Sequence, residues 1–583
     1  MFQNPGNWCR INNDMSFRFA LPVELRDAVS QAAADWQTNN KVARFWQKDP
    51  GLWTRDGEEK WMGWIDIVER QHEDVANFAE LAADVETSGF KTVLLLGMGG
   101  SSLCPEVLAE TFGQQAGFPA LHIVDSTDPA QVKAVRDKLN LKETLVVVAS
   151  KSGSTLEPNI LKQYFFDEMK WAVGADLAGS HFLAITDPGS KMEQVARADG
   201  FRYIFYGDPS IGGRYSALSN FGVVAATVAG LRIGRLLEEA ARAVDSAKLP
   251  VDQNPAVKLG LILGSAANAG RDKITIFTSP EIYDLGAWME QLIAESTGKL
   301  GKGITPVDRE TIGAPAVYGN DRIFAYVRLA GTADSTQDAK VAALEAVGHP
   351  VIHIEIREVY EIFAQFFTWE VATAVAGSVM GINPFNQPDV EAAKIETRAL
   401  TTAYETTGKL PERKPVLLDE GIEIYATDAY AATLTAAAPS ATLAGYLRAH
   451  LDQIHAGDYF AALAFLPMFP AHEAAIQGFR HKVRDRYKVA TCLGFGPRFL
   501  HSTGQDYKGG PNTGVFLQIT ADDAVDVIIP GQKYSFGVVI AAQAAGDLAV
   551  LEAQGRRALR VHLGADVAAG LKTLSDAFDQ ALG

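Results

Sequence analysis

Most of the chain alternates between two patterns of hydrophobic and polar positions. From Lys91 onward, short continuous apolar runs such as residues 92–96 are followed by longer segments in which apolar residues recur at every third or fourth position. A short apolar run is typical of a strand that is buried on both faces, and the longer recurrence is typical of an amphipathic helix. Because the two alternate, the pattern predicts an α/β fold of βαβ units, with parallel sheets covered on both faces.

The alternation divides into three regions. We expect a first α/β domain over residues 86–235, with strands in KTVLLLGMGG, ALHIVDSTDP, TLVVVASKSGST, HFLAITDP and FRYIFYGDP. A second is expected over residues 236–400, with strands in KITIFTSPE, RIFAYVRLAG and PVIHIEI. Residues 441–583 repeat the pattern and predict a third, C-terminal α/β domain.

Two segments lack this alternation. Residues 1–85 are rich in Trp and carry apolar residues at helical spacing, which predicts a helical N-terminal segment packed on the first sheet. Residues 401–440 include the polar, proline-containing stretch TTGKLPERKP, which is typical of a loop. We therefore expect a connection between the second and third regions there.

The acidic balance of the chain narrows the range of partners. The net charge is −17, which argues against nucleic acid, because neutralising a phosphate backbone requires clustered Lys and Arg. The balance does not exclude a small anionic substrate, because a few basic residues and oriented amides suffice for a local anion site. No apolar run is long enough to cross a bilayer, so no membrane partner is expected.

The cysteines indicate the compartment. Cys9, Cys104 and Cys492 are sparse and widely spaced, which fits neither a disulfide framework nor a zinc motif. The N-terminus has no basic stretch followed by an apolar one, so a secretory signal is not predicted. We expect free thiols in a reducing cytoplasm, and a cytoplasmic protein.

A glycine-rich turn follows the first predicted strand. In LLLGMGGSSL, Gly97, Gly99 and Gly100 stand between a strand and a helix, where backbone amides and the helix N-terminus can meet an anion. A tight strand–helix turn explains these glycines equally well. A dinucleotide fold is disfavoured, because the spacing is G-x-G-G-S and no acidic residue ends the next strand in the required register.

A second polar loop follows the third predicted strand. In SKSGST, the hydroxyl residues Ser150, Ser152 and Thr155 alternate with Gly153 directly before a helix. Hydroxyl groups and free helix amides at one point are what a phosphate dianion requires. Both loops follow strands of one predicted sheet, at the edge where open α/β sheets bind ligands, so we favour a phosphate site over a serine-rich helix cap.

These two motifs resemble a known family. LLLGMGGSSL, followed about 50 residues later by SKSGSTLEP, resembles the sugar isomerase (SIS) domain of the phosphoglucose isomerase family. The resemblance implies two SIS-type parallel-sheet sandwich domains, with the helical N-terminal segment before them and the third α/β domain after them. It also implies a set of phosphate-binding residues, with Gly100 against the substrate: Ser101, Ser150, Lys151, Ser152 and Thr155.

Two further segments resemble the catalytic motifs of that family. QLIAESTGK is similar to a signature whose glutamate moves the proton, which implies that Glu295 is the base and that Gln291, one helical turn earlier, lies beside it. GGRYSALS is similar to the segment whose arginine stabilises the enediolate, which implies this role for Arg214 and a substrate contact at Gly213.

The segment GINPFNQPDVEAAK resembles another signature of the family. The resemblance implies that Lys394 contacts the ring oxygen of the sugar and assists ring opening. It implies that Gln387 contacts the phosphate or the sugar.

The histidine that opens the ring departs from the common pattern. Family members usually carry it a few dozen residues after the base, but no histidine occurs between Ser296 and Gly348. His349 and His353 come later, and His353 is predicted in a buried strand. We favour His501, which follows a strand in GFGPRFLHSTGQDYKGGPNTG. That segment resembles the C-terminal part of the isomerase half of fused transaldolase/glucose-6-phosphate isomerases.

The resemblance implies an aldose–ketose isomerase that interconverts glucose 6-phosphate and fructose 6-phosphate through a cis-enediol, without metal or cofactor. It also suggests a homodimer. Two alternatives stay open. A non-catalytic phosphosugar-sensing SIS protein would need the phosphate loops but not the catalytic side chains. A dual phosphoglucose/phosphomannose isomerase would share the mechanism and differ in a few side chains of the pocket.

Overall fold

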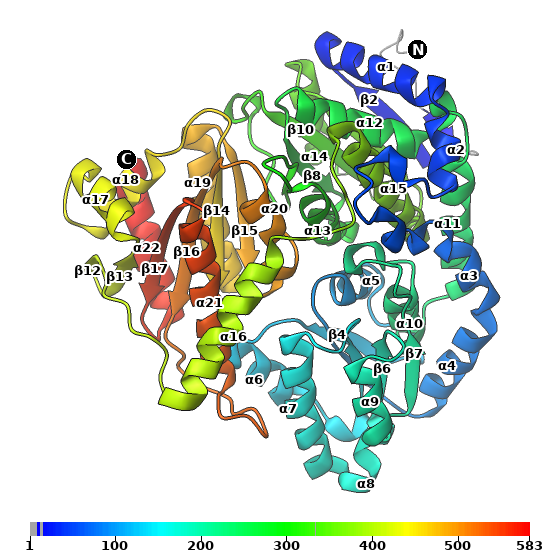
Figure 1. The fold of residues 1–583 in the computed structure, drawn as a ribbon, viewed down its shortest axis with the longest axis horizontal. Helices are drawn as coiled ribbons and strands as arrows, with labels where there is room; N and C mark the ends of the chain where they lie inside the picture. Colours follow the sequence, from blue (N-terminus) through cyan, green and yellow to red (C-terminus); the bar gives the residue numbers. More distant parts are fainter. Residues whose placement is uncertain (1–8, 12–14, 333) are drawn as a thin grey trace.

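Three sheets form the framework of the molecule, as the computed structural model shows (Figure 1). The structure describes residues 9–11, 15–332 and 334–583. Each sheet is built around parallel strands with helices on its faces, so the predicted α/β class is confirmed. The chain passes through the sheets in sequence order, apart from its N-terminal strands.

The first sheet has the strand order β4-β3-β5-β6-β7 and is parallel throughout. The chain goes from β3 to one neighbour and then returns to the other, so the strand order reverses between β3 and β5. Open α/β sheets bind ligands at such a switch point, beyond the carboxyl ends of the strands. All five strands were predicted: β3 (Thr92–Leu96), β4 (Ala120–Val124), β5 (Thr144–Ala149), β6 (Phe182–Thr186) and β7 (Tyr203–Tyr206).

The helices of this region cover both faces of the sheet. The helix α5 follows the glycine-rich turn and α7 follows the SKSGST loop, so both begin at the carboxyl edge of the sheet. The helices are α5 (Leu103–Phe112), α6 (Pro129–Lys138), α7 (Leu156–Val173), α9 (Lys191–Ala198) and α10 (Asn220–Val228).

The second sheet contains an element that the sequence pattern did not reveal. Its order is β1-β2-β11-β10-β8-β9, in which β2 (Met15–Ala20) pairs antiparallel with β11. The expectation that residues 1–85 are helical and pack on the first sheet is therefore wrong for this strand. Phe17 is buried while its neighbours are not, an alternation typical of a strand that completes a sheet edge. The parallel strands are β8 (Lys273–Thr278), β9 (Thr305–Val307), β10 (Arg322–Leu329) and β11 (Val351–Ile356).

Helices fill the rest of the N-terminal segment, as expected. The helix α1 (Val23–Thr38) packs on α12 (Pro255–Asn268) of the second region, whereas α4 (Val75–Thr87) packs on α10 of the first. The catalytic-motif helix α13 (Leu285–Thr297) lies between the first and third regions and contacts α5 and α20 (Gly504–Gly509). The N-terminal segment thus joins the first two regions into one core.

The third sheet has the order β12-β13-β17-β16-β14-β15. Its β12–β13 hairpin lies within residues 401–440, where a connection was expected, and that expectation is wrong. Ile422 and Ile424 alternate with polar residues and are buried in the third core, so the segment has strand periodicity after all. The strands are β12 (Leu417–Asp419), β13 (Ile422–Tyr425), β14 (Tyr459–Phe465), β15 (Ala490–Phe495), β16 (Gly514–Ala521) and β17 (Arg557–Leu563).

Helices cover the third sheet on both faces. The helices α19 (Pro470–Tyr487) and α22 (Val567–Leu582) pack together on one face, and α21 (Phe536–Ala553) lies on the other beneath α16 (Val390–Thr407) (Figure 1). By length and composition α21 and α15 (Ile362–Met380) are apolar enough to cross a bilayer, but most of each is buried within the protein. Both are therefore core helices.

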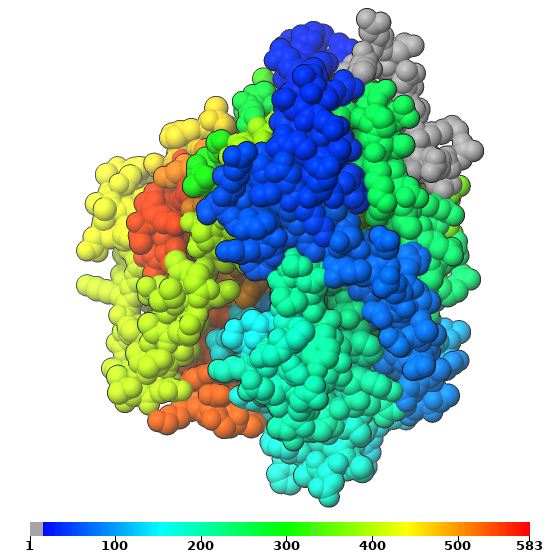
Figure 2. Space-filling model, turned by 45° about the vertical axis from the view of Figure 1, so that its right-hand side comes forward, coloured from blue at the N-terminus to red at the C-terminus, as the bar shows by residue number. Residues whose placement is uncertain are grey.

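The first and third regions meet along a hydrophobic seam. Ile529, Phe536 and Val539 of the C-terminal region belong to the same apolar cluster as one face of the first sheet. In the space-filling view a hollow separates the yellow-green helix α16 from the cyan first domain (Figure 2). The carboxyl edge of the first sheet opens toward this junction.

Candidate active site

A cavity of about 380 Å³ lies where the three regions meet. It sits beyond the carboxyl ends of β3 and β5, at the switch point of the first sheet. Every residue predicted for the site except Arg214 lines it. The predicted residues in the lining are Gly100, Ser101, Ser150, Lys151, Ser152, Thr155, Gly213, Gln291, Glu295, Gln387, Lys394 and His501.

The side of the cavity where the sequence predicts a phosphate site carries several hydroxyl groups, one of them unsatisfied. The Oγ of Ser150 is buried and has no hydrogen-bond partner within the described residues. Thr155 stands at the N-terminus of α7, and its side chain does not cap the helix. Ser152 Oγ lies 2.7 Å from Ser154 Oγ, and Gly153 has a positive φ that aims the loop. An anion at this point would meet hydroxyl donors and the free amides of a helix N-terminus.

Lys151 is anchored at the rim of this loop. Its Nζ pairs with Asp187 and donates to the carbonyl of Asp208 at 3.1 Å. The lysine therefore stands beside the hydroxyl groups, as expected, but its charge is partly matched by a carboxylate.

Two glycine-containing turns touch at the floor of the cavity. A Cβ on Gly100 would lie 1.8 Å from the carbonyl oxygen of Gly213, so only glycine permits this approach. The contact places the turn after β3 directly against the GGRYS segment. The turn Gly99–Ser101 and the segment that carries Arg214 are thus fixed relative to each other.

Glu295 is held in the last turn of α13. Its side chain is 10% exposed, and Oε2 accepts a hydrogen bond of 3.1 Å from Gln291 Nε2. The two residues lie one turn apart on the same helix face, as the spacing predicted. A carboxylate that is held by a side-chain donor and lines the cavity can accept a proton from a bound molecule.

Arg214 lies behind this carboxylate and does not line the cavity. Its guanidinium is 1% exposed and donates to Ser296 Oγ at 2.7 Å and to Gln387 Oε1 at 2.8 Å, while its Nη1 is 3.6 Å from Glu295 Oε1. It also binds the carbonyls of Pro384 and Asn386. These bonds fix the Gln387 loop next to Glu295. A direct contact of Arg214 with an enediolate stays a prediction.

His501 reaches the cavity from the C-terminal region on the turn η12 (Arg498–His501). Its Nε2 lies 3.0 Å from Glu157 Oε1, and the same oxygen accepts a bond of 2.7 Å from Gln543 Nε2. Burial would raise the pKa of Glu157, but His501, a backbone hydrogen bond and the charge of Lys394 together outweigh burial and hold that pKa below its ordinary value. Because the ionised carboxylate of Glu157 can only accept a hydrogen bond, His501 must carry a proton on Nε2. In the neutral imidazole Nδ1 is then the nitrogen that can accept a proton.

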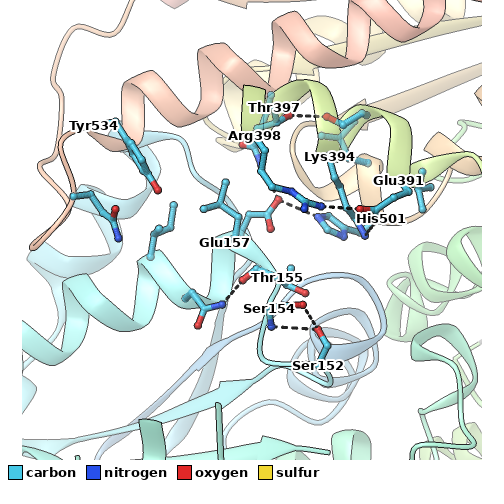
Figure 3. A pocket seen from close by; sticks show the side chains of 18 of the residues that line it. Ser152, Ser154, Thr155, Glu157, Glu391, Lys394, Thr397, Arg398, His501 and Tyr534 are labelled. Carbon is cyan, nitrogen blue, oxygen red and sulfur yellow. Dashed lines mark hydrogen bonds and ion pairs between the residues drawn. The ribbon is translucent and has the colours of Figure 1, made fainter. Parts of the chain in front are cut away.

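Glu157 is a site residue that the sequence reasoning missed. It lies in the first turn of α7, and the motifs of the sequence gave it no role. Figure 3 shows it pointing from α7 toward His501. The sequence did contain a signal for this residue, a glutamate just after SKSGST in a helical turn expected to face a phosphate. A carboxylate at that position needs a cationic or polar partner, which marks it as part of a site.

Lys394 extends from α16 on the other side of His501 (Figure 3). It is 43% exposed, and its Nζ lies 3.7 Å from Glu391 Oε2. A second cavity of about 440 Å³ adjoins the first and shares Ser152, Thr155, Lys394 and His501 with it. The lysine and the histidine therefore stand between the two cavities.

The other histidines considered for this role lie elsewhere. His353, on the interior strand β11 of the second sheet, is bonded to Arg18 and Glu345. Neither it nor His349 lines the cavity. Cys104 and Cys492 are free and buried, and burial raises the pKa of both, that of Cys492 to about 12. The side chain of Cys9 lies outside the described residues.

Comparisons with known proteins relate part of the chain to one family. Residues 69–321 match the family model described as phosphoglucose isomerase. A glucose-6-phosphate isomerase of Trichormus variabilis is 30% identical over 308 residues, a match that covers 51% of this chain and 56% of the relative. One of Rubrobacter xylanophilus is 29% identical over 377 residues, which covers 57% of this chain and 87% of that one. The match thus spans little more than half of the first relative.

Solved structures share the fold. The crystal structure of a glucose-6-phosphate isomerase from Chlamydia trachomatis aligns with a TM-score of 0.57 at 18% identity, over 68% of this chain and 90% of that one. A hypothetical protein from Thermus thermophilus gives the same TM-score at 23% identity, over 66% of this chain and 99% of that one. At these identities the likeness concerns the fold alone.

Proposed function

We propose that this chain, whose residues 69–321 match the phosphoglucose isomerase family model, is a member of that family and interconverts glucose 6-phosphate and fructose 6-phosphate. The observation that carries the proposal is the meeting of three groups in one cavity. Hydroxyl groups, among them the unpartnered Oγ of Ser150, lie on one side, Glu295 lies on the floor, and His501, which is bonded to Glu157, lies opposite. The activity belongs to glycolysis and gluconeogenesis.

Binding of the phosphate comes first. Ser101, Ser150, Ser152 and Thr155 donate to the phosphate oxygens, and the N-terminus of α7 adds backbone amides. Because Ser150 Oγ is buried without a partner, a phosphate oxygen would satisfy it. This anchor orients the sugar with its reacting carbons toward Glu295 and His501.

Ring opening follows. Lys394 contacts the ring oxygen and supplies its proton, and His501 accepts the proton of the anomeric hydroxyl, so that the ring C–O bond breaks and a carbonyl forms. Glu157 fixes the imidazole with the proton on Nε2 and stabilises the imidazolium that forms.

Isomerisation is a proton transfer between C2 and C1. Glu295 removes the proton from C2 of the open aldose, which gives the enediolate; the hydroxyl proton of O2 passes to O1 through the cis-enediol, and Glu295 returns its proton to C1 to give the ketose. Gln291 holds the carboxylate, and Arg214 lies within 3.6 Å of it. We propose that Arg214 lowers the energy of the enediolate from this position. The chemistry needs only these protein groups.

The alternatives differ in what the cavity must contain. A phosphosugar sensor would use the phosphate loops alone, so a glutamate and a histidine aimed at the same space favour catalysis. A dual phosphoglucose/phosphomannose isomerase would use the same groups, and mannose 6-phosphate is therefore the second substrate to test.

We also propose a cytoplasmic homodimer whose C-terminal region corresponds to that of fused transaldolase/glucose-6-phosphate isomerases. The RFLHSTG segment supports the correspondence. Because His501 comes from the same chain as Glu295 and the phosphate loops, one chain supplies all of these groups.

The decisive experiment is a coupled assay with chelator present. Purified protein receives fructose 6-phosphate, and glucose 6-phosphate is read by NADP reduction. We expect turnover that survives chelation. Saturable binding of fructose 6-phosphate without turnover would contradict the isomerase and favour the sensor.

A further inference from the structure

The turn that carries His501 begins with a buried arginine. Arg498 donates to both carboxylate oxygens of Glu106, at 2.6 and 2.7 Å, and to Asp125 Oδ1 at 2.9 Å. Its Nε lies 2.8 Å from Asp125 Oδ2. Burial opposes the charge of Arg498, but Asp125 and Glu106 outweigh it and raise its pKa. One guanidinium thus pairs with two carboxylates, with hydrogen bonds from two of its nitrogens to Glu106 and from one to Asp125.

Both carboxylates belong to the first domain and stand close to the phosphate loop. Glu106 is on α5, the helix that begins just after the turn Gly99–Ser101. Asp125 directly follows β4, and its Oδ2 accepts a bond of 3.1 Å from Ser102 Oγ. The C-terminal turn is therefore attached to the same short segment that lines the cavity.

The other end of the turn is held as well. The carbonyl oxygen of His501 accepts a bond of 2.8 Å from Gln291 Nε2, the amide that also binds Glu295. A Cβ on Gly99 would lie 2.9 Å from that carbonyl oxygen, so the turn after β3 packs directly on His501. Arg498 at one end and the His501 carbonyl at the other fix the turn against the first domain and α13.

We propose that Arg498 is a positioning residue for ring opening, which holds His501 in its catalytic place by binding Glu106 and Asp125. The proposal rests on the function proposed above. The imidazole has to stay within hydrogen-bond reach of the sugar, and its turn belongs to a separate sheet with its own core. A planar guanidinium can hydrogen-bond to two carboxylates at once in a fixed orientation. A lysine ammonium attracts them only as a point charge and does not fix their orientation.

The test separates ring opening from isomerisation. In Glu295→Gln protein the base is gone but the ring-opening groups remain, so exchange between the anomers of fructose 6-phosphate, followed by NMR, reports His501 and Lys394. We expect Arg498→Met in this background to slow the catalysed exchange by about 10²-fold, the cost of a displaced catalytic group. Arg498→Lys is expected to fall between Arg498→Met and the parent.

A matched control is available on the same C-terminal region. Arg484 of α19 also crosses to another region, donating to the carbonyl of Thr311 at 2.6 Å and lying 3.4 Å from Glu310 Oε1, but it does not line the cavity. Arg484→Met should leave anomer exchange unchanged. Because Arg498→Met removes a buried charge, Glu106→Gln is the second variant. This variant keeps the shape of the Arg498 clamp, meaning Arg498 with Glu106 and Asp125, and we expect it to slow anomer exchange by about 10-fold.

The outcomes are distinguishable. If anomer exchange is unchanged in Arg498→Met and Glu106→Gln while the wild type is active as an isomerase, only the positioning role of Arg498 is overturned. A wild type without isomerase activity would overturn the proposed function and the ring-opening role with it. Equal slowing in the Arg484 and Arg498 variants would show a general effect of domain docking and would also overturn the proposal. Retained binding of inorganic phosphate, measured by titration, confirms that the variants keep a folded first domain.

Discussion

The two sides of the cavity are held in different ways. On the phosphate side, Ser150, Ser152 and Thr155 lie within one loop between a buried strand and a helix, so neighbours in the sequence place them. On the ring-opening side, His501 is placed by Glu157, Gln291 and the Arg498 clamp, whose partners are far away in the sequence. A local loop is fixed once its strand folds, whereas a docked turn depends on the packing of a whole domain.

The largest expected effect concerns the base that lies between the two sides. Glu295→Gln keeps the shape and the neighbours of the side chain but removes the proton acceptor. We expect kcat to fall by at least ~10³ with phosphate affinity retained, because general base catalysis contributes about that much. Steady-state kinetics in both directions measure the loss. A variant with nearly wild-type kcat would sink the assignment of Glu295.

The next effect tests the docked side. In His501→Asn we expect about 10²-fold slower conversion of hexose 6-phosphates. A tetrose 4-phosphate cannot close a ring through its phosphorylated oxygen, so its isomerisation should change much less. The comparison of the two rates isolates ring opening. An equal loss on both substrates would refute the ring-opening role of His501.

A smaller effect is expected on the local side. Ser150→Ala removes a buried donor that a phosphate oxygen would satisfy. A hydrogen bond to a charged group contributes about 1.5–3 kcal/mol, so KM should rise by roughly 10-fold or more while kcat changes little. Ser154→Ala is the matched control, since Ser154 does not line the first cavity. A fall in kcat at unchanged KM would place Ser150 outside the phosphate site.

The smallest effect concerns the stability of the docked side. Asp506, on α20 behind the His501 turn, is buried and accepts a bond of 2.8 Å from Thr305 Oγ1, and burial raises its pKa to about 7. Between about pH 4 and pH 7 the unfolded chain loses this proton and the folded one keeps it. Stability therefore falls as pH rises through this range.

Asp506→Asn removes that dependence. We expect the Tm of the variant, relative to wild type, to rise between about pH 4.5 and pH 7.5. Glu157→Gln is the opposite case, because the pKa of Glu157 is lowered and its ionised form stabilises the fold. Its relative Tm should be lower at neutral pH and recover as pH falls below the ordinary range of a glutamate. A Tm difference for Asp506→Asn that is flat across this range would contradict the raised pKa.

The contrast also explains what could be predicted from the sequence. The strands of the first sheet, both phosphate loops and the helix with Glu295 were predicted, because glycine turns, hydroxyl runs and helical spacing are local signals. The partners of His501 were not, because no local pattern states that Arg498 will meet Glu106 and Asp125. For the same reason β2 and the β12–β13 hairpin were missed, since each completes the edge of a sheet formed by distant strands.

The central claim is that Glu295 moves a proton through an enediol, and isotope exchange tests it most directly. Glucose 6-phosphate and fructose 6-phosphate are brought to equilibrium in D₂O with chelator present, and deuterium at C2 of the aldose is followed by NMR. A base that carries the proton exchanges it with solvent. We expect deuterium to accumulate over repeated turnovers with the wild type and not with Glu295→Gln. Interconversion of the sugars over many turnovers without any deuterium at C2 would contradict it.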